Sequence, residues 1–245
     1  MSGHSHWAKI KRAKGANDAK RGKVWSKIAR KIIIAARAGG GDPRDNLTLR
    51  YVIDEGRAAN MPKDTIEKAI AKGTGEGGAE HFESAVYEGY VPGGVALMIE
   101  VLTNNRSRTA PEMRKILETH GGSLAVSGSV AFQFTKQGLI SVKTDAIAED
   151  TLLEKALDAG AEDVKNEGEF YDVVTTPTSF HKVRESLIAA GIPIEASEIT
   201  NVPNTTVPLT KEAAEKLLKL IEIFDDHEDV QSVSHNAEIP ESVVV

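Results

Sequence analysis

The glycine-rich stretch GTGEGG, residues 73 to 78, separates two parts of the chain whose hydrophobic patterns differ. Before it, apolar residues recur at the spacing of an α-helix; after it, short apolar runs alternate with helical segments. Strands that alternate with helices are typical of domains in which helices cover a sheet. With 245 residues, more than one domain is expected. The pattern predicts an α+β protein, in which a small helical domain precedes two ferredoxin-like domains, one inserted in the other.

Three helices are predicted before the glycine-rich stretch, over residues 20 to 38, 46 to 59 and 62 to 73. On the first, apolar side chains fill one half of the helical wheel and Lys and Arg fill the other, which predicts a basic outer face. The sequence GGGDP, residues 39 to 43, ends this helix, because glycines and an Asp-Pro step do not continue it. The apolar residues are Val24, Trp25, Ile28, Ala29, Ile32, Ile33 and Ala36.

A regular series of six elements is predicted over residues 139 to 200. Their order is strand, helix, strand, strand, helix, strand, which is that of the ferredoxin-like split βαβ fold. The six segments are residues 139–144, 149–159, 162–166, 170–175, 179–190 and 194–200.

The flanking segments supply the parts of a second α+β domain. Two strands, a helix capped by Thr109 and Glu112, and a further strand precede the series; a strand, a helix and a strand follow it. The strands are residues 84–90, 94–102 and 129–134 before the series, and 205–209 and 230–235 after it. The predicted domains are 1–78, then 79–137 together with 204–245, and 138–203 as the inserted domain. A simple tandem arrangement is the alternative.

Charge is distributed very unevenly along the chain. Residues 1 to 31 contain ten Lys and Arg and a single acid, Asp18, whereas residues 79 to 245 contain more than twice as many acidic as basic groups. The net charge of the whole chain is −6. A clustered basic block in an acidic protein favours a polyanion partner, namely nucleic acid, either DNA or ribosomal RNA. The alternative is that the block neutralises the acidic body of the same molecule.

The basic residues of this block are the predicted phosphate contacts. Such contacts position a nucleic acid without reading its bases, and no base-reading helix is recognisable. Reversing the charges of Lys23, Lys27 and Arg30 is expected to weaken binding and to leave the fold intact. Two arginines of the loop TNNRSRT, residues 103 to 109, are either further phosphate contacts or part of a capping loop. The candidates are Lys9, Lys11, Arg12, Lys14, Lys20, Arg21, Lys23, Lys27, Arg30, Lys31, Arg106 and Arg108.

Motifs for catalysis, cofactors or metals are not recognisable. The chain has no cysteine, so thiolate chemistry and disulfides are excluded, which fits a reducing cytoplasm. No apolar run approaches the length of a membrane span. His4 and His6 lack an obvious third ligand, and the acid-rich DDHED, residues 225 to 229, is expected to be a solvated loop. The chain is therefore expected to be a cytoplasmic non-enzyme with no cofactor, no metal and no membrane partner. An enzyme remains the distant alternative if His81, His120 and His181 converge with acids in one pocket.

Several segments together resemble the YebC/PmpR family. They are GHSHWAKIKRAKGANDAKRGK, AARAGGGDPRDNLTLR, NMPKDTIEKAI, YEGYVPGGVALMIEV, NNRSRT and GSVAFQF, with weaker matches toward the end of the chain. They run in order through the first domain and much of the second. Trp25 departs from the pattern, since relatives more often have Phe there.

The resemblance implies a three-domain cytoplasmic protein that regulates gene expression. Members are described as DNA-binding transcriptional regulators. Others, including the mitochondrial translational activator of cytochrome oxidase, act with ribosomes, notably at proline-rich stretches. Both descriptions imply a polyanion partner, and the basic block fits either. The sequence does not indicate an oligomeric state.

Overall fold

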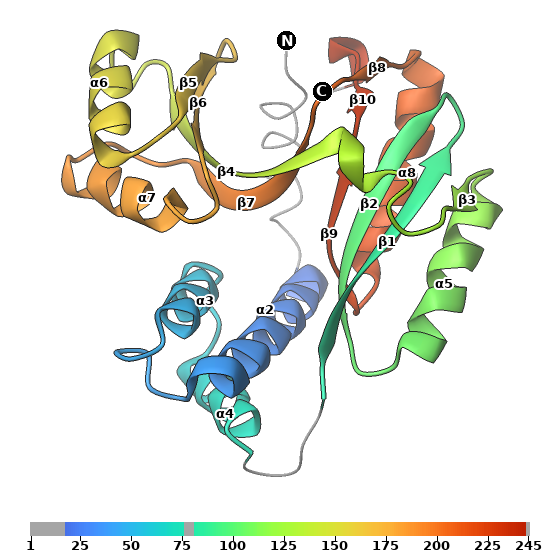
Figure 1. The fold of residues 1–245 in the computed structure, drawn as a ribbon, viewed down its shortest axis with the longest axis horizontal. Helices are drawn as coiled ribbons and strands as arrows, with labels where there is room; N and C mark the ends of the chain where they lie inside the picture. Colours follow the sequence, from blue (N-terminus) through green and yellow to red (C-terminus); the bar gives the residue numbers. More distant parts are fainter. Residues whose placement is uncertain (1–17, 76–80, 244–245) are drawn as a thin grey trace.

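The computed structural model describes residues 18–75 and 81–243. Its first part is a helical domain in which one long helix packs against two shorter ones (Figure 1). Ile32, Leu49 and Ile66, one from each helix, meet in its core, and the indole of Trp25 donates a hydrogen bond to the carbonyl of Ala59, 3.0 Å away. The helices are α2 (Asp18–Gly39), α3 (Leu47–Ala58) and α4 (Lys63–Gly73).

Two local features fix where these helices lie. Asn46 caps α3, since its side chain accepts a hydrogen bond from the amide of Leu49 and donates to the carbonyls of Ala35 and Gly40. Gly73 lets α4 approach α2 closely: a Cβ at this position would lie 2.6 Å from the Cβ of Ala36.

The second part contains a four-stranded antiparallel sheet in the order β3-β1-β2-β9. Its core joins strand residues such as Leu97 and Ile99 to Leu117 and Phe224 of two helices. A separate pair of short parallel strands lies beside it, and a 3-10 turn follows at Glu241–Val243. The elements are β1 (Glu83–Val91), β2 (Val95–Thr103), α5 (Arg106–Thr119), β3 (Ser123–Leu124), β8 (Val207–Pro208), α8 (Lys211–Asp226), β9 (Val230–His235) and β10 (Ala237–Glu238).

A second four-stranded antiparallel sheet, in the order β5-β6-β4-β7, is formed between β3 and β8 in the chain. Two helices pack on one face of it, where Ile140, Leu152 and Leu187 share a core. This order is that of the ferredoxin-like fold. The elements are β4 (Phe134–Lys143), α6 (Glu149–Ala159), β5 (Asp163–Asn166), β6 (Phe170–Thr175), α7 (Phe180–Ala189) and β7 (Ala196–Pro203). The predicted α+β class, with N-terminal helices before the sheets, is confirmed.

The strand predicted at residues 129 to 134 is wrong. Residues Ala131–Gln133 form a 3-10 turn, and β3 instead is the strand that follows α5 and pairs with β1. The buried carboxylate of Glu88 accepts hydrogen bonds from the amides of Gly128 and Val130, each 2.6 Å away, and of Ala131 at 3.0 Å. These amides are therefore not available to a neighbouring strand.

The start predicted for α5 is also wrong. Asn105 caps this helix by accepting a hydrogen bond from the amide of Arg108, so the helix begins three residues before Thr109. The domain division remains a prediction. The chain leaves the first sheet after β3 and returns to it at β9, while β4 begins at Phe134, before the predicted boundary at 138.

Two of the contacts between the helical domain and the rest of the molecule join residues that are distant in the chain. Side chains of α2 contact the end of α8 and the loop that follows it. In the ribbon view, α3 lies near α7 (Figure 1). At the second of these contacts the ring of Tyr51 stacks on that of His181, with centroids 3.3 Å apart, and Arg50 forms an ion pair with Glu185. Burial, with nearby arginines, lowers the pKa of His181 and so favours its neutral form in this contact.

Candidate nucleic-acid interface

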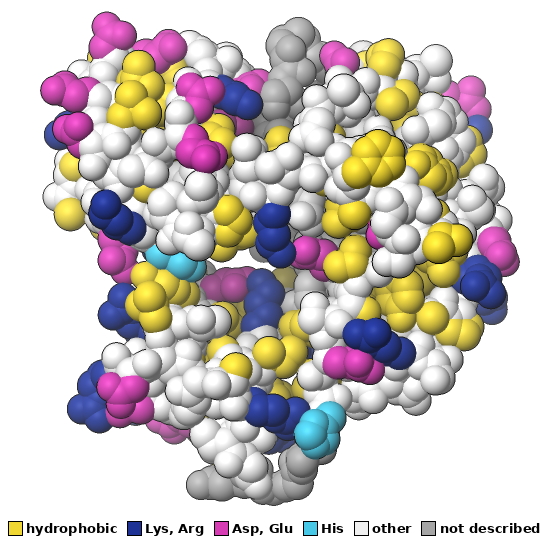
Figure 2. Space-filling view, viewed as in Figure 1, with side chains coloured by type: hydrophobic (Ala, Val, Ile, Leu, Met, Phe, Trp, Pro, Cys, Tyr) yellow, Lys and Arg dark blue, Asp and Glu magenta, His cyan; other side chains and the backbone are white. Residues whose placement is uncertain are grey.

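Three of the predicted phosphate contacts lie along one side of α2, at positions 23, 27 and 30. Lys23 forms an ion pair with Asp226 at 3.2 Å, and the amine of Lys27 donates to the carbonyl of Asp225 at 2.8 Å. All three side chains contact residues 225–229, which we call the acidic segment. In the space-filling view, basic and acidic side chains lie side by side on the molecule (Figure 2).

Arg30 is the most deeply placed of these cations, with a side chain only 14% exposed. Its guanidinium lies 2.8 Å from Asp229 Oδ1 and 3.3 Å from Glu228 Oε2, and it also donates to the carbonyl of Glu228. The ring of Phe82 lies beneath it, 5.3 Å from ring centroid to guanidinium carbon. Arg30 therefore joins α2 to the first sheet's domain through charge, hydrogen bonds and ring contact.

The carboxylate of Asp229 accepts hydrogen bonds from side chains of two domains. Its side chain is 1% exposed, and its Oδ2 accepts hydrogen bonds from Arg108, 2.8 Å away, and from the hydroxyl of Thr109, 2.7 Å away. Burial alone would raise the pKa of Asp229, but the hydrogen bonds from Thr109 and Arg108 and the charge of Arg30 outweigh it and lower the pKa. The hydrogen bond to Asp229 correspondingly raises the pKa of Arg108. The carboxylate is thus held in its charged form.

The two arginines of the TNNRSRT stretch lie in the first turn of α5 rather than in a loop. Arg106 forms an ion pair with Glu83 at 2.8 Å and donates to the carbonyl of Ser84. Arg108 contacts the buried carboxylate of Asp229. Both side chains remain about half exposed, so each keeps surface that an anion could approach.

Among the remaining candidates, the structure describes the side chain of Lys31 alone. Lys31 forms an ion pair with Glu55 of α3 at 2.8 Å. Lys9, Lys11, Arg12 and Lys14 lie outside the described residues, as do the side chains of Lys20 and Arg21.

The solvated loop predicted at residues 225 to 229 is wrong, because Asp225 and Asp226 are the last residues of α8 and Asp229 is buried. Asp229, Glu228 and Thr109 are contacts that were not predicted. The opposite charges of the basic block and the acidic segment could have indicated these contacts. They agree with the alternative that the basic block neutralises acidic groups of the same molecule. Arg30 and Asp229 are 199 residues apart in the chain, so no local sequence pattern could predict that they pair.

The three histidines that would have favoured an enzyme have different surroundings. His81 contacts Arg37, His120 bonds to its own helix at Ile116, and His181 stacks on Tyr51. Among residues 18–75 and 81–243, no group of three or more His, Asp and Glu is placed to hold a metal ion. Within the same ranges, no helix is long and apolar enough to cross a membrane.

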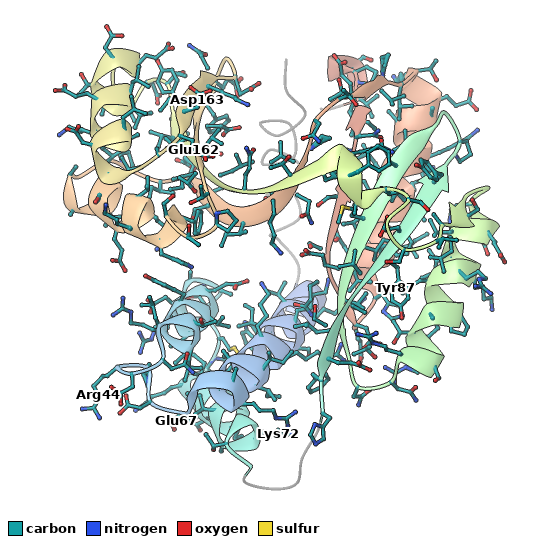
Figure 3. All side chains as sticks on the ribbon, in the orientation of Figure 1. Arg44, Glu67, Lys72, Tyr87, Glu162 and Asp163 are labelled. Atoms are coloured by element: carbon teal, nitrogen blue, oxygen red, sulfur yellow. The ribbon has the colours of Figure 1, made fainter. Side chains whose placement is uncertain are left out.

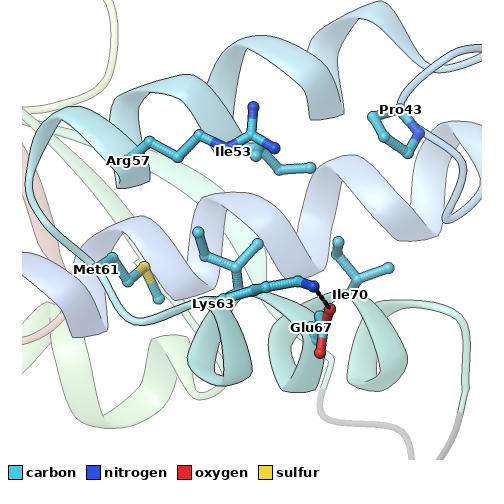
Figure 4. Close-up of a pocket in the computed structure, with 8 residues that line it drawn as sticks. Pro43, Ile53, Arg57, Met61, Lys63, Glu67 and Ile70 are labelled. Carbon is cyan, nitrogen blue, oxygen red and sulfur yellow. Dashed lines mark ion pairs between the residues drawn. The ribbon is translucent and has the colours of Figure 1, made fainter.

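A cavity of about 310 Å³ opens between α3 and α4 (Figure 4). Its lining is mostly apolar, and charged groups stand at its rim, where Lys63 and Glu67 form an ion pair at 3.5 Å. It is lined by Pro43, Ile53, Arg57, Met61, Lys63, Ile66, Glu67 and Ile70, none of which is a predicted phosphate contact.

Comparison with known proteins gives matches along nearly the whole chain. Residues 5–76 match the model of the TACO1/YebC protein N-terminal domain, and residues 82–237 match that of the TACO1/YebC second and third domain. A protein of Carboxydothermus hydrogenoformans is 48% identical over 98% of this chain and 99% of its own length. One of Treponema pallidum (strain Nichols) is 49% identical over 100% of both chains. Each bears the name "probable transcriptional regulatory protein".

A solved structure supports the same assignment. The conserved hypothetical protein Aq1575 from Aquifex aeolicus is 44% identical and superposes with a TM-score of 0.83, covering 95% of this chain and 96% of that one. The resemblance noted in the sequence is confirmed, and this chain belongs to the TACO1/YebC family.

Proposed function

We propose that this protein is a non-enzymatic nucleic-acid-binding regulator of gene expression. The observation that carries the proposal is the concentration of ten Lys and Arg with one acid in residues 1–31 of an otherwise acidic chain. Binding would draw its free energy from phosphate neutralisation and counterion release, which require clustered cations but no base-reading helix. The names of the relatives point to transcription, so DNA is the first partner to test.

The test uses the four cations that precede α2, because Lys23, Lys27 and Arg30 also hold the acidic segment. Affinity of the wild type for a 30-base-pair DNA duplex and for a structured RNA is measured over a range of salt concentrations. Neutralising Lys9, Lys11, Arg12 and Lys14 to Gln should weaken binding and reduce the salt slope by about one unit for each phosphate that the variant no longer neutralises.

The matched control neutralises four exposed lysines elsewhere, Lys68, Lys115, Lys155 and Lys219, and should leave the slope nearly unchanged. Equal losses of affinity in the two variants would mean that only net charge matters and would contradict the proposal. Ultraviolet crosslinking in growing cells then identifies the partner. Crosslinks at promoters support the transcriptional role, and crosslinks concentrated on ribosomal RNA support the alternative of a translation factor.

A further inference from the structure

The acidic segment offers α2 the same chemistry that a phosphate backbone would offer. Lys23 meets the carboxylate of Asp226, Lys27 meets the carbonyl oxygen of Asp225, and Arg30 meets the carboxylate of Glu228. The three cations lie at intervals of four and three residues, so they form one row on the helix. The acidic segment follows this row with oxygen acceptors, as a nucleic-acid strand does with phosphates.

We propose that the acidic segment is an internal competitor of nucleic acid. In the closed form described here it occupies the row Lys23, Lys27 and Arg30; in an open form the helical domain moves away and this row binds phosphates. The proposal rests on the proposed function, because it assumes a nucleic-acid ligand. According to this proposal, nucleic acid binds the basic residues that precede α2 and, in the open form alone, also the row on α2.

The exposed ion pairs of the closed form can be replaced by contacts with phosphates. The side chains of Lys23 and Asp226 are 48% and 50% exposed, and that of Glu228 is 78% exposed. Ion pairs between exposed groups contribute little net free energy, because water and salt screen them. A polyanion that supplies several phosphates at once can therefore replace them.

The buried contact does not prevent opening. When Arg30 leaves, Asp229 keeps the hydrogen bonds from Arg108 and Thr109, so its charge is not left unpaired in the interior. The contact between α3 and α7 must also separate. It consists of the Tyr51–His181 ring pair and the ion pair between Arg50 and Glu185, whose side chains are 46% and 55% exposed. This contact is narrow compared with the cores within the domains.

The experiment weakens the competitor without touching the cations. The double variant Asp226→Asn, Glu228→Gln removes two carboxylates that face α2. Its control, Asp163→Asn, Glu162→Gln, removes the first residue of β5 and the Glu that precedes it, both far from α2 (Figure 3). Both variants change net charge equally. The chain contains no cysteine, so cysteines at the exposed positions Ala58 and Thr119 can carry spin labels that report the distance between the helical domain and α5.

The probes are the 30-base-pair DNA duplex and the structured RNA, at one fixed salt concentration. Asp226→Asn, Glu228→Gln should bind about three- to tenfold more tightly than the control variant, because a larger fraction of the protein is open. Adding the nucleic acid to the wild-type labelled protein should convert a narrow distance distribution into a longer one.

The possible failures are distinguishable. If the wild type binds and the two variants have equal affinity, with no change in the label distance, the competitor proposal is overturned and the proposed function stands. If only the variant without the two carboxylates binds, the competitor proposal is supported strongly. If neither the wild type nor either variant binds, both proposals are overturned.

Discussion

At the scale of single residues, Asp229 joins the helical domain to the first sheet's domain. Its carboxylate accepts from Arg30 of the helical domain and from Arg108 and Thr109 of α5. A buried carboxylate is stabilising only where donors compensate for its lost hydration. Here three donors do so, which explains why an acid can occupy a site that is closed to water.

Replacing Asp229 by Asn should therefore destabilise the protein by about 2–3 kcal/mol, because the arginines lose their buried partner. The value is at the lower end for buried pairs, since Arg108 is about half exposed and retains hydration. Urea unfolding at pH 7 measures the loss, and Glu228→Gln, at an exposed position, is the control, expected to change stability by less than about 0.5 kcal/mol. Equal effects of the two substitutions would contradict the role given to Asp229.

The same variant has a defined pH dependence. The folded protein lowers the pKa of Asp229 below its ordinary value of 3.8, so the stabilisation is fully present above about pH 4 and is lost as pH falls through the folded pKa. The difference in stability between wild type and Asp229→Asn should therefore stay constant from pH 7 to about pH 5 and shrink below pH 4. If the difference in stability between wild type and Asp229→Asn increased as the pH fell, the lowered pKa of Asp229 would be contradicted.

At the scale of elements, close helix packing depends on which glycines face a neighbour. Gly73 of α4 lies against α2, where an added Cβ would be 2.6 Å from the Cβ of Ala36 and 2.7 Å from the carbonyl oxygen of Ile33. Gly22 of α2 has nothing within 4 Å of the position that a Cβ would occupy. Both glycines are helical, so the packing alone distinguishes them.

Alanine at these two positions should have opposite effects. Gly22→Ala should stabilise the helical domain by about 0.5 kcal/mol or slightly more, because alanine restricts the unfolded chain and favours helix. Gly73→Ala should destabilise it by about 1–3 kcal/mol, because the new methyl group would force α4 away from the backbone of α2. Thermal unfolding of both variants followed by circular dichroism checks the signs. A stabilised Gly73→Ala would show that the two helices are free to separate.

At the scale of the whole molecule, the chain completes the second sheet, β4 to β7, between β3 and β9 of the first sheet. The strands at the two ends of this segment are neighbours, with Phe134 paired to Pro203 and Ser141 paired to Ala196. The chain therefore leaves and re-enters the first sheet's domain at nearly one point. The links that remain between the sheets include the carboxylate of Glu100 in β2, which accepts hydrogen bonds from Lys136 of β4 and Asn201 of β7.

Replacing residues 134–203 by a short Gly-Ser loop should leave the first sheet and the helical domain folded. Residues 134–203 expressed alone should also fold, since they carry a complete sheet, two helices and their own core. Circular dichroism and amide dispersion in NMR spectra measure both outcomes. An unfolded excised segment together with an unfolded remainder would contradict the division into inserted and host domains.

Local periodicity, turn residues and composition were enough to predict the helices, most strands, the α+β class and the separation of charge. The predictions were wrong where a side chain elsewhere in the fold binds backbone amides that the local pattern assigns to a strand or a helix start. Glu88 takes the amides of residues 128–131 from a strand, and Asn105 starts α5 earlier than the Thr109 pattern indicates. The contact between the row of cations on α2 and the acidic segment, nearly 200 residues away, could be seen in the folded molecule alone, because electrostatic pairing depends on distance in space and not on order along the chain.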